Sequence, residues 1–384
     1  MRLAIITTHP IQYYAPVFKL LSQSIEVMVF YTWGEEAQQK FDPGFGKTIA
    51  WDIPLLDGYP YQWVKNTAPN PGSHHFKGIV NPDLINQVKN WQPDAILIYG
   101  WAYNSHLKVI RHFKNKIPLY FRGDSTLLDG QKGIKNLLRS LVLRWVYSHV
   151  NYVFYVGTNN KAYFQKYGLK SDQLFFAPHA IDNNRFEVDR SQEATNIRSG
   201  LGIKPDDRVI LFAGKLEEKK SPQMLLDAFL SMGIPNAHLL FVGNGPLENS
   251  LKASAADSEK VHFLPFQNQS VMPAIYQSCN IFCLPSKGPN ETWGLAVNEA
   301  MAAGRPVLVS DKCGCAIDLV DSGINGEMFE AGSRSSLIQK LSLLLENKTG
   351  LSTLGNNAKT KVASWSFEIQ AETILKTLKN TYAK

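Results

Sequence analysis

The stretch RVILFAGKLEEKKSPQMLLDAFLSM (residues 208–232) decides the fold class of this chain. The apolar run 208–214 has the length of a buried strand and ends at Gly214. Ser221 followed by Pro222 is a start signal for a helix that reaches about Met232. A strand, a glycine turn and a helix in this order are typical of a parallel α/β sheet.

The same alternation of apolar runs and helical stretches occurs twice along the chain. Because short apolar runs between helices are typical of strands buried on both faces, the pattern predicts two doubly wound parallel sheets. The strands predicted for the first half are 2–7, 26–32, 95–100, 118–122, 152–157 and 174–178. Those predicted for the second half are 208–214, 238–243, 261–265, 281–285 and 305–310.

Three segments follow from this division: an N-terminal Rossmann-like domain over 1–190, a C-terminal Rossmann-like domain over 191–362, and a C-terminal helix over 363–384 that can cross back to the first domain. The polar stretch 183–200 is the predicted linker, and the less regular residues 33–90 are expected to form loops. Ligands of such folds bind beyond the carboxyl ends of the strands, so the two domains are expected to face a central cleft.

Composition limits the classes of protein. A chain of 384 residues, 44% hydrophobic, is long enough for two substantial cores. The sequence has no apolar run near the roughly 18 residues of a membrane span, and its start has too short an apolar stretch for a signal peptide, so we expect a cytoplasmic location. The cysteines match no common zinc pattern and are expected to be free thiols near buried strands; they are Cys279, Cys283, Cys313 and Cys315.

Positive charge is concentrated in the first half. Residues 1–190 carry a net charge of +7, and residues 101–150 alone hold nine Lys plus Arg against two Asp plus Glu. An anionic partner is therefore expected to meet the N-terminal half. The chain has no recognisable nucleic-acid-binding module, so we do not expect nucleic acid to be that partner.

The stretch ETWGLAVNEAMAAG (291–304) holds two glutamates eight positions apart. A helix is predicted from Leu295 to a stop at Gly304, and its free N–H groups near Gly294 could hold a phosphate. Eight helical steps would separate Glu291 and Glu299 by roughly 12 Å. This exceeds the roughly 5 to 9.5 Å between the two carboxyls of a glycosidase, so two carboxylates that grip different parts of a long ligand fit better.

Two further turns are candidates for phosphate binding. FAGKLEEKKSP (212–222) presents Lys215, Lys219 and Lys220 ahead of a helix, which suits a diphosphate; the alternative is an ordinary solvated charge run. FVGNGP (241–246) is a second glycine turn after a strand, and such a turn is weak evidence by itself.

Together these motifs resemble the retaining family 4 glycosyltransferases, which have the GT-B fold of two Rossmann-like domains. In the C-terminal half the resemblance rests on FAGKLEEKKSP, FVGNGP, VHFLPF, IFCLPSKGPNETWGLAVNEAMAAGRPVLVSD and INGEMF, with the E-x7-E motif of that family at Glu291 and Glu299. In the N-terminal half it is looser and rests on PDAILIYG, FYVGTNNKAYFQKYGL and PHAIDNNRF.

The resemblance implies that residues 1–190 bind the acceptor and residues 191–362 bind the nucleotide-sugar donor. It also implies a role for each candidate residue. Glu299 would bind the ribose, Glu291 with the amides of 293–295 would hold the donor sugar, and Lys215 and Lys220 would neutralise the diphosphate. The catalytic candidates are Glu291, Lys215, Lys220 and Asp124. The donor-binding candidates are Gly214, Gly243, Thr292, Trp293, Gly294, Leu295 and Glu299, and the acceptor-side candidates are His9, Gln12 and Tyr13.

Three residues depart from the pattern of the family. Lys215 stands where arginine is usual, which keeps the charge but loses the bidentate fork. Pro265 replaces a common glycine near the base pocket. Asp124 falls where many members carry a histidine that reaches the donor sugar, so the choice or orientation of the sugar is open; the alternative is that Asp124 only caps the following segment.

The implied activity is retaining transfer of a hexose from a nucleoside-diphosphate sugar to a glycan, lipid-linked or small-molecule acceptor, as in cell-surface polysaccharide synthesis. No D-x-D sequence is present, so we expect no divalent metal and no other cofactor. The alternatives are a sugar-nucleotide epimerase or phosphorylase on the same fold, or a silent nucleotide-sugar binding protein. We do not expect a nicotinamide dehydrogenase, because LAIITTHPIQYY (3–14) lacks the glycine-rich turn that such an enzyme has after its first strand.

The segment KGIKNLLRSLVLRWVYSH (132–149) predicts an amphipathic helix. Its apolar stripe, at positions 134, 137, 138, 141, 142, 145 and 146, is interpreted as packing on the N-terminal sheet. Lys132, Lys135 and Arg139 fall largely outside that stripe. We therefore hypothesise that the basic side of residues 132–149 meets an anionic membrane surface and makes the protein peripheral on the inner face of the membrane.

Overall fold

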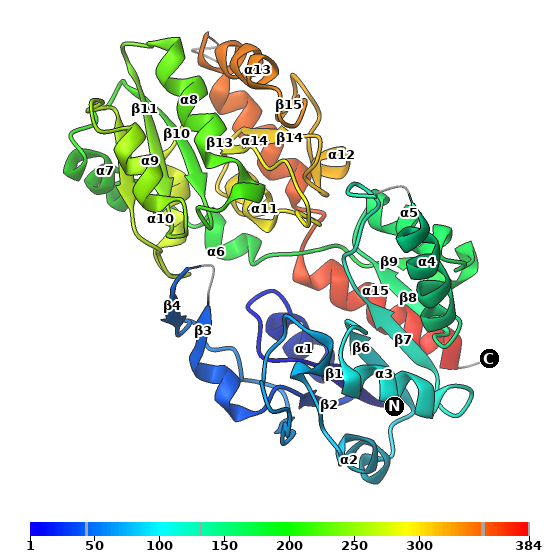
Figure 1. Cartoon of the computed structure of the whole chain (residues 1–384). Helices are drawn as coiled ribbons and strands as arrows, with labels where there is room; N and C mark the ends of the chain where they lie inside the picture. The colour runs from blue at the N-terminus through cyan, green and yellow to red at the C-terminus, as the bar shows by residue number, and fades with distance from the viewer. Residues whose placement is uncertain (43–44, 131–132, 347–349, 383–384) are drawn as a thin grey trace. The chain divides into compact units, whose positions relative to one another are not determined.

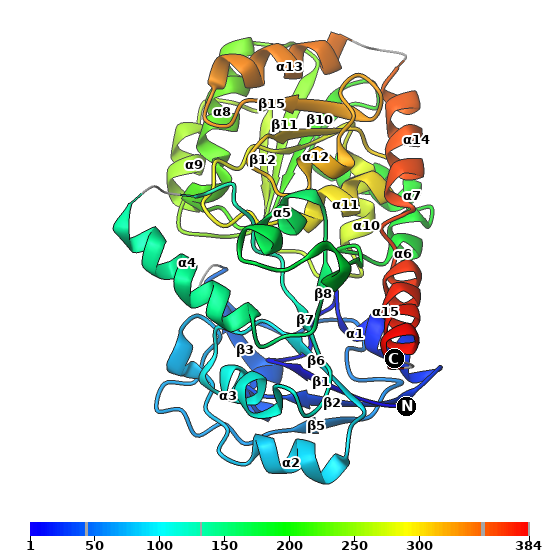
Figure 2. The same ribbon diagram turned by 90° about the vertical axis from the view of Figure 1, so that its right-hand side faces the viewer.

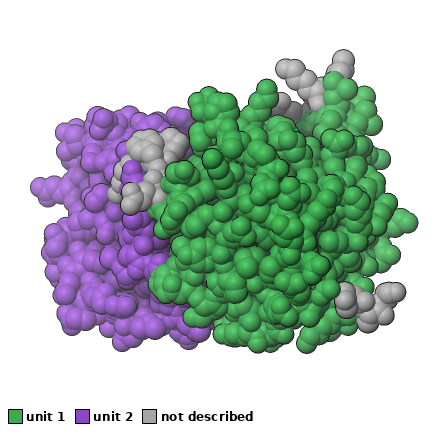
Figure 3. All heavy atoms as spheres, turned by 90° about the horizontal axis from the view of Figure 1, so that it is seen from below, with its two compact units in different colours: residues 1–40, 54–179, 367–384 green, residues 41–53, 180–366 purple. Residues whose placement is uncertain are grey.

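A computed structural model describes residues 1–42, 45–130, 133–346 and 350–382, with the backbone alone for residues 39–42, 47, 134, 135 and 382. The chain forms two compact units, which Figure 3 distinguishes by colour. Unit 1 comprises residues 1–40, 54–179 and 367–384, and unit 2 comprises residues 41–53 and 180–366.

Unit 1 is built on a parallel sheet in the order β5-β2-β1-β6-β7-β8-β9. In its centre Ile5 lies opposite Val29 on one side and Leu97 on the other, and all three are fully buried. The strands are β1 (Arg2–Thr7), β2 (Glu26–Tyr31), β5 (Tyr61–Trp63), β6 (Ala95–Tyr99), β7 (Leu119–Arg122), β8 (Tyr152–Tyr155) and β9 (Leu174–Phe176).

Helices cover both faces of this sheet, as its strands require. Ala4 and Ile6 of β1 share one hydrophobic core with buried residues of α2, α3, α4 and α5. Helices α1 and α15 are not part of that core and pack against each other (Figures 1 and 2). The helices are α1 (Ala15–Ser22), α2 (Leu84–Trp91), α3 (Asn104–Phe113), α4 (Ile134–Tyr147), α5 (Thr158–Lys166) and α15 (Phe367–Tyr382), with short 3-10 turns at Glu35–Gln39, Phe76–Gly78 and Ser171–Gln173.

Unit 2 is built on a second parallel sheet, in the order β12-β11-β10-β13-β14-β15. Its strands are β10 (Arg208–Ala213), β11 (Ala237–Val242), β12 (Val261–Leu264), β13 (Ile281–Leu284), β14 (Val307–Ser310) and β15 (Gly326–Phe329). Its helices are α6 (Asn183–Glu187), α7 (Ser191–Gly200), α8 (Pro222–Met232), α9 (Glu248–Ser254), α10 (Met272–Ser278), α11 (Leu295–Ala302), α12 (Ala316–Leu319), α13 (Arg334–Glu346) and α14 (Leu351–Val362), with a 3-10 turn at Glu218–Lys220.

The two predicted parallel sheets are confirmed, and each of the eleven predicted strands is present with ends within two residues of those expected. The predicted helices from Leu295 and from Pro222 are also confirmed. The sequence missed β15 and the short strands β3 (Lys40–Asp42), β4 (Lys47–Ile49) and β5 within the irregular segment 33–90. Three-residue strands carry too little periodicity to be recognised.

The predicted linker 183–200 is wrong, because these residues form α6 and α7. Asp182 accepts a hydrogen bond from the backbone N–H of Arg185 and so caps α6. The Arg198 guanidinium of α7 donates to the carbonyl oxygens of Ser278, at 3.1 Å, and Asp207, at 2.6 Å. A local cap and contacts with residues outside 183–200 therefore stabilise helices whose sequence resembles a polar linker.

The predicted packing of the α4 stripe on the sheet is also wrong for most of its members. Val146 is buried, but Leu137, Leu138, Leu141, Val142 and Trp145 are all exposed. The core-facing residues of α4 are Leu143, Val146 and Tyr147. Lys132 lies outside the described residues, as do the side chains of Ile134 and Lys135. In the described part of the chain, the helices are too short or too polar to cross a membrane.

Candidate functional site

Two glycine turns meet at the carboxyl ends of β10 and β11. The N–H of Gly214 donates to the carbonyl oxygen of Val242 at 2.9 Å. Gly243 has a φ of +135°, and a Cβ at this position would stand 2.1 Å from the carbonyl oxygen of Gly214. Any larger residue at 243 would force the two backbones apart, so glycine is required for this close approach.

Lys220 and Glu291 form a largely buried ion pair next to these turns. The Nζ of Lys220 lies 2.7 Å from Oε2 of Glu291, and their side chains are 15% and 9% exposed. The Ser286 hydroxyl donates to the same carboxylate oxygen at 3.0 Å. Two donors thus fix the position of the Glu291 carboxylate and offset part of its desolvation.

The loop between Glu291 and α11 is held by the segment that follows β14. The Gly314 N–H donates to the carbonyl oxygen of Glu291, and the Cys315 N–H donates to that of Trp293, both at 3.0 Å. Gly294 precedes α11 with a φ of +97°, a conformation that other residues rarely adopt. The N-terminus of α11 therefore begins directly after Glu291, Thr292 and Trp293, and its N–H groups favour an anion there.

Glu299 lies within α11 and is 4% exposed. The buried Tyr276 hydroxyl donates to Oε2 of Glu299 at 2.8 Å. The hydrogen bond comes from α10, so two helices of unit 2 orient this carboxylate.

The substitution Tyr276→Phe is expected to weaken binding at Glu299 without removing the carboxylate. It deletes a hydrogen bond to a buried charged group, which is worth about 1.5 to 3 kcal/mol in folding stability. We expect the midpoint of urea unfolding to fall and affinity for a nucleoside diphosphate to drop by a few fold. Chemical denaturation and calorimetric titration measure these quantities. An unchanged unfolding midpoint would contradict the assigned hydrogen bond.

A segment from far along the chain contacts Lys215 and the end of β12. The Nζ of Lys215 lies 5.0 Å from the ring centroid of Phe45, and that ring lies 4.9 Å from Phe266 in an edge-to-face arrangement. Trp51 also lies against Phe266, with 6.2 Å between centroids. The Ser270 hydroxyl donates to the Asp52 carboxylate. No local pattern in the sequence predicts these contacts, because they join residues at least 170 positions apart.

The acceptor-side candidates lie in unit 1, in the loop after β1. The Thr8 hydroxyl and Nδ1 of His9 are 2.8 Å apart, and the His9 ring meets Trp33 edge-on at 5.3 Å. Gln12 is buried and Tyr13 is partly buried in the same loop. Asp124 follows β7, at the same carboxyl edge of the sheet.

A buried polar cluster that the sequence did not identify lies beside Asp124. Arg122 is 2% exposed and donates through Nη1 and Nη2 to the carbonyl oxygens of Ala177 and Pro178, at 2.8 and 2.9 Å. The Arg122 guanidinium thus fixes the turn before His179. Burial and the nearby Arg122 lower the pKa of His179 to about 4, so its imidazole is neutral at pH 7.

Tyrosines complete this cluster. The ring of Tyr14 lies 4.7 Å from that of Tyr99 and 6.3 Å from that of His179. Burial raises the pKa of Tyr99 to about 12. It also raises the pKa of Tyr14, with a further contribution from the charge of Asp124. Both phenols therefore remain protonated at neutral pH and can donate hydrogen bonds.

The structure divides the candidate residues between the two units. Unit 1 holds Asp124 and the acceptor-side candidates His9, Gln12 and Tyr13. Unit 2 holds Lys215, Lys220, Glu291, Gly214, Gly243, Thr292, Trp293, Gly294, Leu295 and Glu299. Within unit 2, the ion pair directly joins Lys220 to Glu291, although 71 residues separate them.

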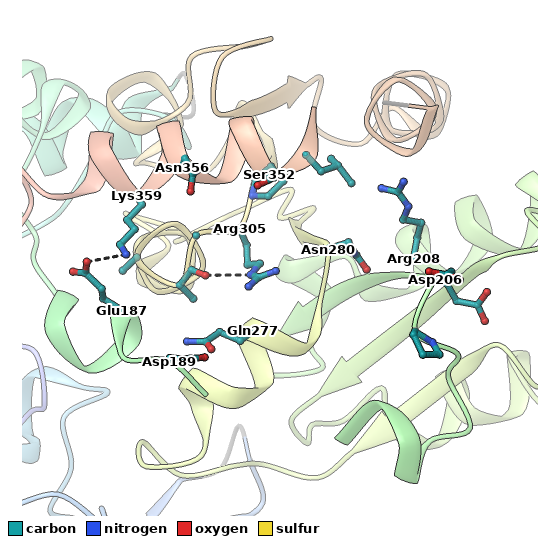
Figure 4. A pocket seen from close by; sticks show the side chains of 17 residues that line it. Glu187, Asp189, Asp206, Arg208, Gln277, Asn280, Arg305, Ser352, Asn356 and Lys359 are labelled. Carbon is teal, nitrogen blue, oxygen red and sulfur yellow. Dashed lines mark hydrogen bonds and ion pairs between the residues drawn. The ribbon is translucent and has the colours of Figure 1, made fainter. Parts of the chain in front are cut away.

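A cavity of about 570 Å³ lies at the opposite end of the unit 2 sheet (Figure 4). It is lined by residues that precede or begin β10, β13 and β14, including Arg208, Asn280 and Pro306. An ion pair of 2.7 Å between Lys359 and Glu187 crosses part of it. Ligands of doubly wound sheets bind at the carboxyl ends of the strands, so we do not assign this cavity to the candidate site.

The four cysteines are free and buried, as predicted. Burial raises the pKa of Cys313 to about 12, which keeps its thiol protonated and unreactive. Among the described residues, no group of three or more His, Cys, Asp or Glu side chains is arranged to hold a metal ion.

Residues 193–361 match the family described as glycosyl transferases group 1. The D-inositol 3-phosphate glycosyltransferase of Nocardia farcinica is 27% identical over 221 residues, which cover 54% of this chain and 48% of that protein. An uncharacterized glycosyltransferase of Methanocaldococcus jannaschii is 28% identical over 216 residues, which cover 54% of each chain. The chain thus spans about half the length of the curated relatives that it matches.

Similarity to solved structures extends over the whole chain. The Anabaena protein Alr3699/HepE, crystallised with UDP and glucose, superposes with a TM-score of 0.74 at 18% identity, covering 99% of this chain and 100% of that one. Sucrose-phosphate synthase from Thermosynechococcus elongatus superposes with a TM-score of 0.76 at 17% identity, covering 100% and 99%. Residues 193–361 are therefore similar to the glycosyl transferases group 1 family, and the whole chain has the two Rossmann-like domains of the GT-B fold.

Proposed function

We propose that the protein is a retaining glycosyltransferase that moves a hexose from a nucleoside-diphosphate sugar to a glycan, lipid-linked or small-molecule acceptor. The observation that carries this proposal is the Lys220–Glu291 ion pair of 2.7 Å, held between the glycine turn after β10 and the start of α11. A cation, a carboxylate and a helix N-terminus in one place suit a diphosphate that carries a sugar.

In this proposal the donor lies along the carboxyl ends of β10 and β13. Glu299 binds the ribose hydroxyls, and Glu291 with the N–H groups of Trp293 to Leu295 binds the transferred sugar. Lys215, Lys220 and the α11 N-terminus face the diphosphate, where they stabilise the negative charge that develops as it leaves. Gly214 and Gly243 keep side chains out of the space that the phosphates need.

The proposed reaction needs no covalent intermediate with the enzyme. The bond between the anomeric carbon and the phosphate oxygen breaks, and an acceptor hydroxyl forms a new bond to that carbon on the same face. The hydroxyl proton passes to the departing phosphate oxygen. The positive groups act on this oxygen, so their effect is larger in the transition state than in the ground state.

The acceptor is proposed to bind unit 1, through His9, Gln12 and Tyr13, within the predicted acceptor domain 1–190, and Asp124 of the same unit is proposed as a catalytic residue. Neutral His179 and protonated Tyr14 near Asp124 provide hydrogen-bonding groups that suit the hydroxyls of a sugar or polyol. The predicted donor domain is 191–362. We propose a cytoplasmic location, peripheral on the inner face of a membrane.

We propose that the nucleotide of the donor is uridine diphosphate. Support comes from the Anabaena protein of similar fold, which was crystallised with UDP and with UDP-glucose. The Nocardia farcinica relative is named D-inositol 3-phosphate glycosyltransferase, so we propose to include phosphorylated polyols among the soluble acceptors that are screened.

The test is release of nucleoside diphosphate from a nucleotide sugar, measured with and without acceptor. A transferase releases it when acceptor is added and forms a glycosylated product with retained anomeric configuration by NMR. An epimerase would instead convert the donor without acceptor, and a phosphorylase would require inorganic phosphate. A protein that binds donor but turns over with none of these partners would be a silent binding protein, contrary to the proposal.

Transfer is expected to proceed without divalent metal, because lysine side chains and backbone N–H groups supply the positive potential that a metal would otherwise supply. We expect EDTA to change kcat by less than about twofold. The measurement is initial rate after dialysis against EDTA, with Mg²⁺ and Mn²⁺ added back as controls. Activity that EDTA abolishes and Mg²⁺ restores would contradict the expectation.

A further inference from the structure

Helix α4 exposes a row of large apolar side chains to solvent. The exposed fractions are 63% for Leu137, 60% for Leu138, 58% for Leu141, 50% for Val142 and 44% for Trp145. Exposed apolar residues scattered singly are ordinary, but contiguous apolar surface on a monomer marks an interaction site. Figure 2 shows α4 at the outer side of unit 1.

The row occupies one continuous face of the helix. At 100° per residue, its members fall within an arc of about 140°. Leu143, Val146 and Tyr147 project from the other side of the helix into the core of unit 1, where each is at most 3% exposed. The helix is therefore anchored to its domain by a second apolar face, and the exposed row is not needed for that packing.

Arg144 borders the exposed row on one side, and Arg139 lies on the other side, beyond the buried Val146. On the same helical projection, Arg144 lies about 20° beyond Leu137 and Arg139 lies about 60° beyond Val142, and both arginine side chains are exposed. The guanidinium carbon of Arg111, on α3, lies 5.7 Å from the ring centroid of Trp145. Residues 134–147 contain no acidic residue, so the charged side chains of the helix itself are all basic.

We propose that α4 docks on an anionic phospholipid bilayer, with Leu137, Leu138, Leu141, Val142 and Trp145 inserted at the headgroup boundary and the flanking arginines on lipid phosphates. An apolar face bordered by cationic side chains is the pattern of a helix that lies in the membrane interface. Arginine can keep its stem along the apolar face while its charged end reaches the phosphates. The sequence pattern alone points only to the basic side of the helix, whereas in the structure the apolar row is exposed and inserts, with the arginines beside it.

A bilayer fits this face better than a second copy of the chain. A symmetric dimer would bring the same surface of both copies together, and hence Arg139 and Arg144 of one copy towards those of the other. A standard interface also buries roughly 800 Å² on each partner, which is more than one row of half-exposed side chains supplies. An anionic leaflet provides negative charge for the arginines and an apolar layer for the row.

The experiment is flotation of the full chain with phosphatidylcholine vesicles containing 30% phosphatidylglycerol, against vesicles of phosphatidylcholine alone. Leu137→Ser with Leu138→Ser is expected to weaken partitioning at least tenfold. The matched control is Ile324→Ser with Leu343→Ser in unit 2, where two side chains of 56% and 50% exposure are changed in the same way. Partitioning of this control is expected to stay within twofold of the unchanged protein.

Two further measurements separate insertion from charge attraction. Arg139→Gln with Arg144→Gln should weaken binding mainly to the anionic vesicles and reduce its salt dependence, because fewer lipid phosphates are contacted. Lipids brominated along their acyl chains should quench tryptophan fluorescence of the unchanged protein. Trp145→Phe should remove most of that quenching, although seven of the eight tryptophans remain.

Failure of the unchanged protein to float with anionic vesicles at low salt would overturn the proposal. So would a Leu137→Ser/Leu138→Ser variant that floats as well as the unchanged protein with unaltered quenching. A dimer in sedimentation velocity that this variant dissociates, without any vesicle binding, would assign the row to self-association instead. The proposed function enters this proposal only in that a membrane-bound enzyme could reach a lipid-linked acceptor. Vesicle binding is measured without donor or acceptor, so membrane docking and sugar transfer can each be disproved without the other.

Discussion

The substitution Lys220→Ala is expected to lower kcat of sugar transfer by about 100- to 1000-fold, the usual loss when a group that stabilises developing negative charge is removed. Lys220 is the cation that contacts Glu291, and in the proposed reaction it faces the departing diphosphate. Initial-rate kinetics at saturating donor measure the effect. The neighbouring Lys219→Ala is the matched control, because its 3.4 Å ion pair with Glu217 is more exposed, and its kcat is expected to stay within about threefold.

Loss of Lys220 also lowers the free energy of unfolding, so this effect must be separated from the effect on kcat. Removing one partner of a buried ion pair costs about 3 to 5 kcal/mol, because the other charge is left uncompensated. The double variant Lys220→Ala/Glu291→Gln removes that charge and should recover much of the unfolding free energy in urea. It should recover none of the activity. A Lys220→Ala variant that is folded at assay temperature and retains more than a tenth of kcat would contradict the role of the lysine.

The two glutamates are expected to give different losses. Glu299→Ala should weaken binding of the nucleoside diphosphate by about ten- to hundredfold, because a charged hydrogen bond is worth about 1.5 to 3 kcal/mol. Glu291→Ala should leave that affinity nearly unchanged or slightly tighter, because Lys220 then gains freedom to approach the phosphates. Its kcat should fall strongly, because Glu291 is proposed to hold the transferred sugar.

Calorimetric titration measures the affinity of each variant for nucleoside diphosphate, and steady-state kinetics measure its kcat. Tyr276→Phe serves as the control for Glu299→Ala, because it perturbs the same buried hydrogen bond of 2.8 Å and leaves the carboxylate in place. Equal effects of Glu291→Ala and Glu299→Ala on diphosphate affinity would refute the separate roles.

The sheets could be predicted because their strands are continuous apolar runs bounded by glycine, proline and helix signals. β10 and β11 illustrate this, since both are almost entirely buried and both end at a glycine. Parallel order follows because each run is separated from the next by a helical stretch. The glycine turns and the start of α11 could therefore be located before any tertiary contact was known.

Tertiary contacts could not be predicted in the same way. The sequence offers Lys215, Lys219 and Lys220 as near-equal candidates, and only the adjacency of β10 and β13 selects Lys220 as the partner of Glu291. The contact of Phe45 with Phe266 likewise depends on how a segment of the N-terminal half folds onto unit 2.

Helix α4 shows a different limit. Periodicity located an apolar stripe but could not tell which of two apolar faces the sheet would cover. Leu143 and Tyr147, which lie outside the predicted stripe, pack in the core, and the predicted stripe is mostly exposed. The polar composition of 183–200 led to the wrong prediction of a linker for a related reason. The carbonyl oxygens that accept hydrogen bonds from Arg198 lie outside this segment, so its composition does not show them.

The measurement that tests the central claim most directly is thermal unfolding of the chain with nucleoside diphosphates, compared with the corresponding nucleosides. A ligand at 100 times its Kd adds roughly 2.7 kcal/mol of stability. We expect one diphosphate to raise Tm by several degrees, its nucleoside to have a much smaller effect, and Glu299→Ala and Lys220→Ala each to reduce the shift at the same concentration. If no diphosphate raises Tm, or if both variants keep the full shift, residues around Lys220, Glu291 and Glu299 are not a donor site.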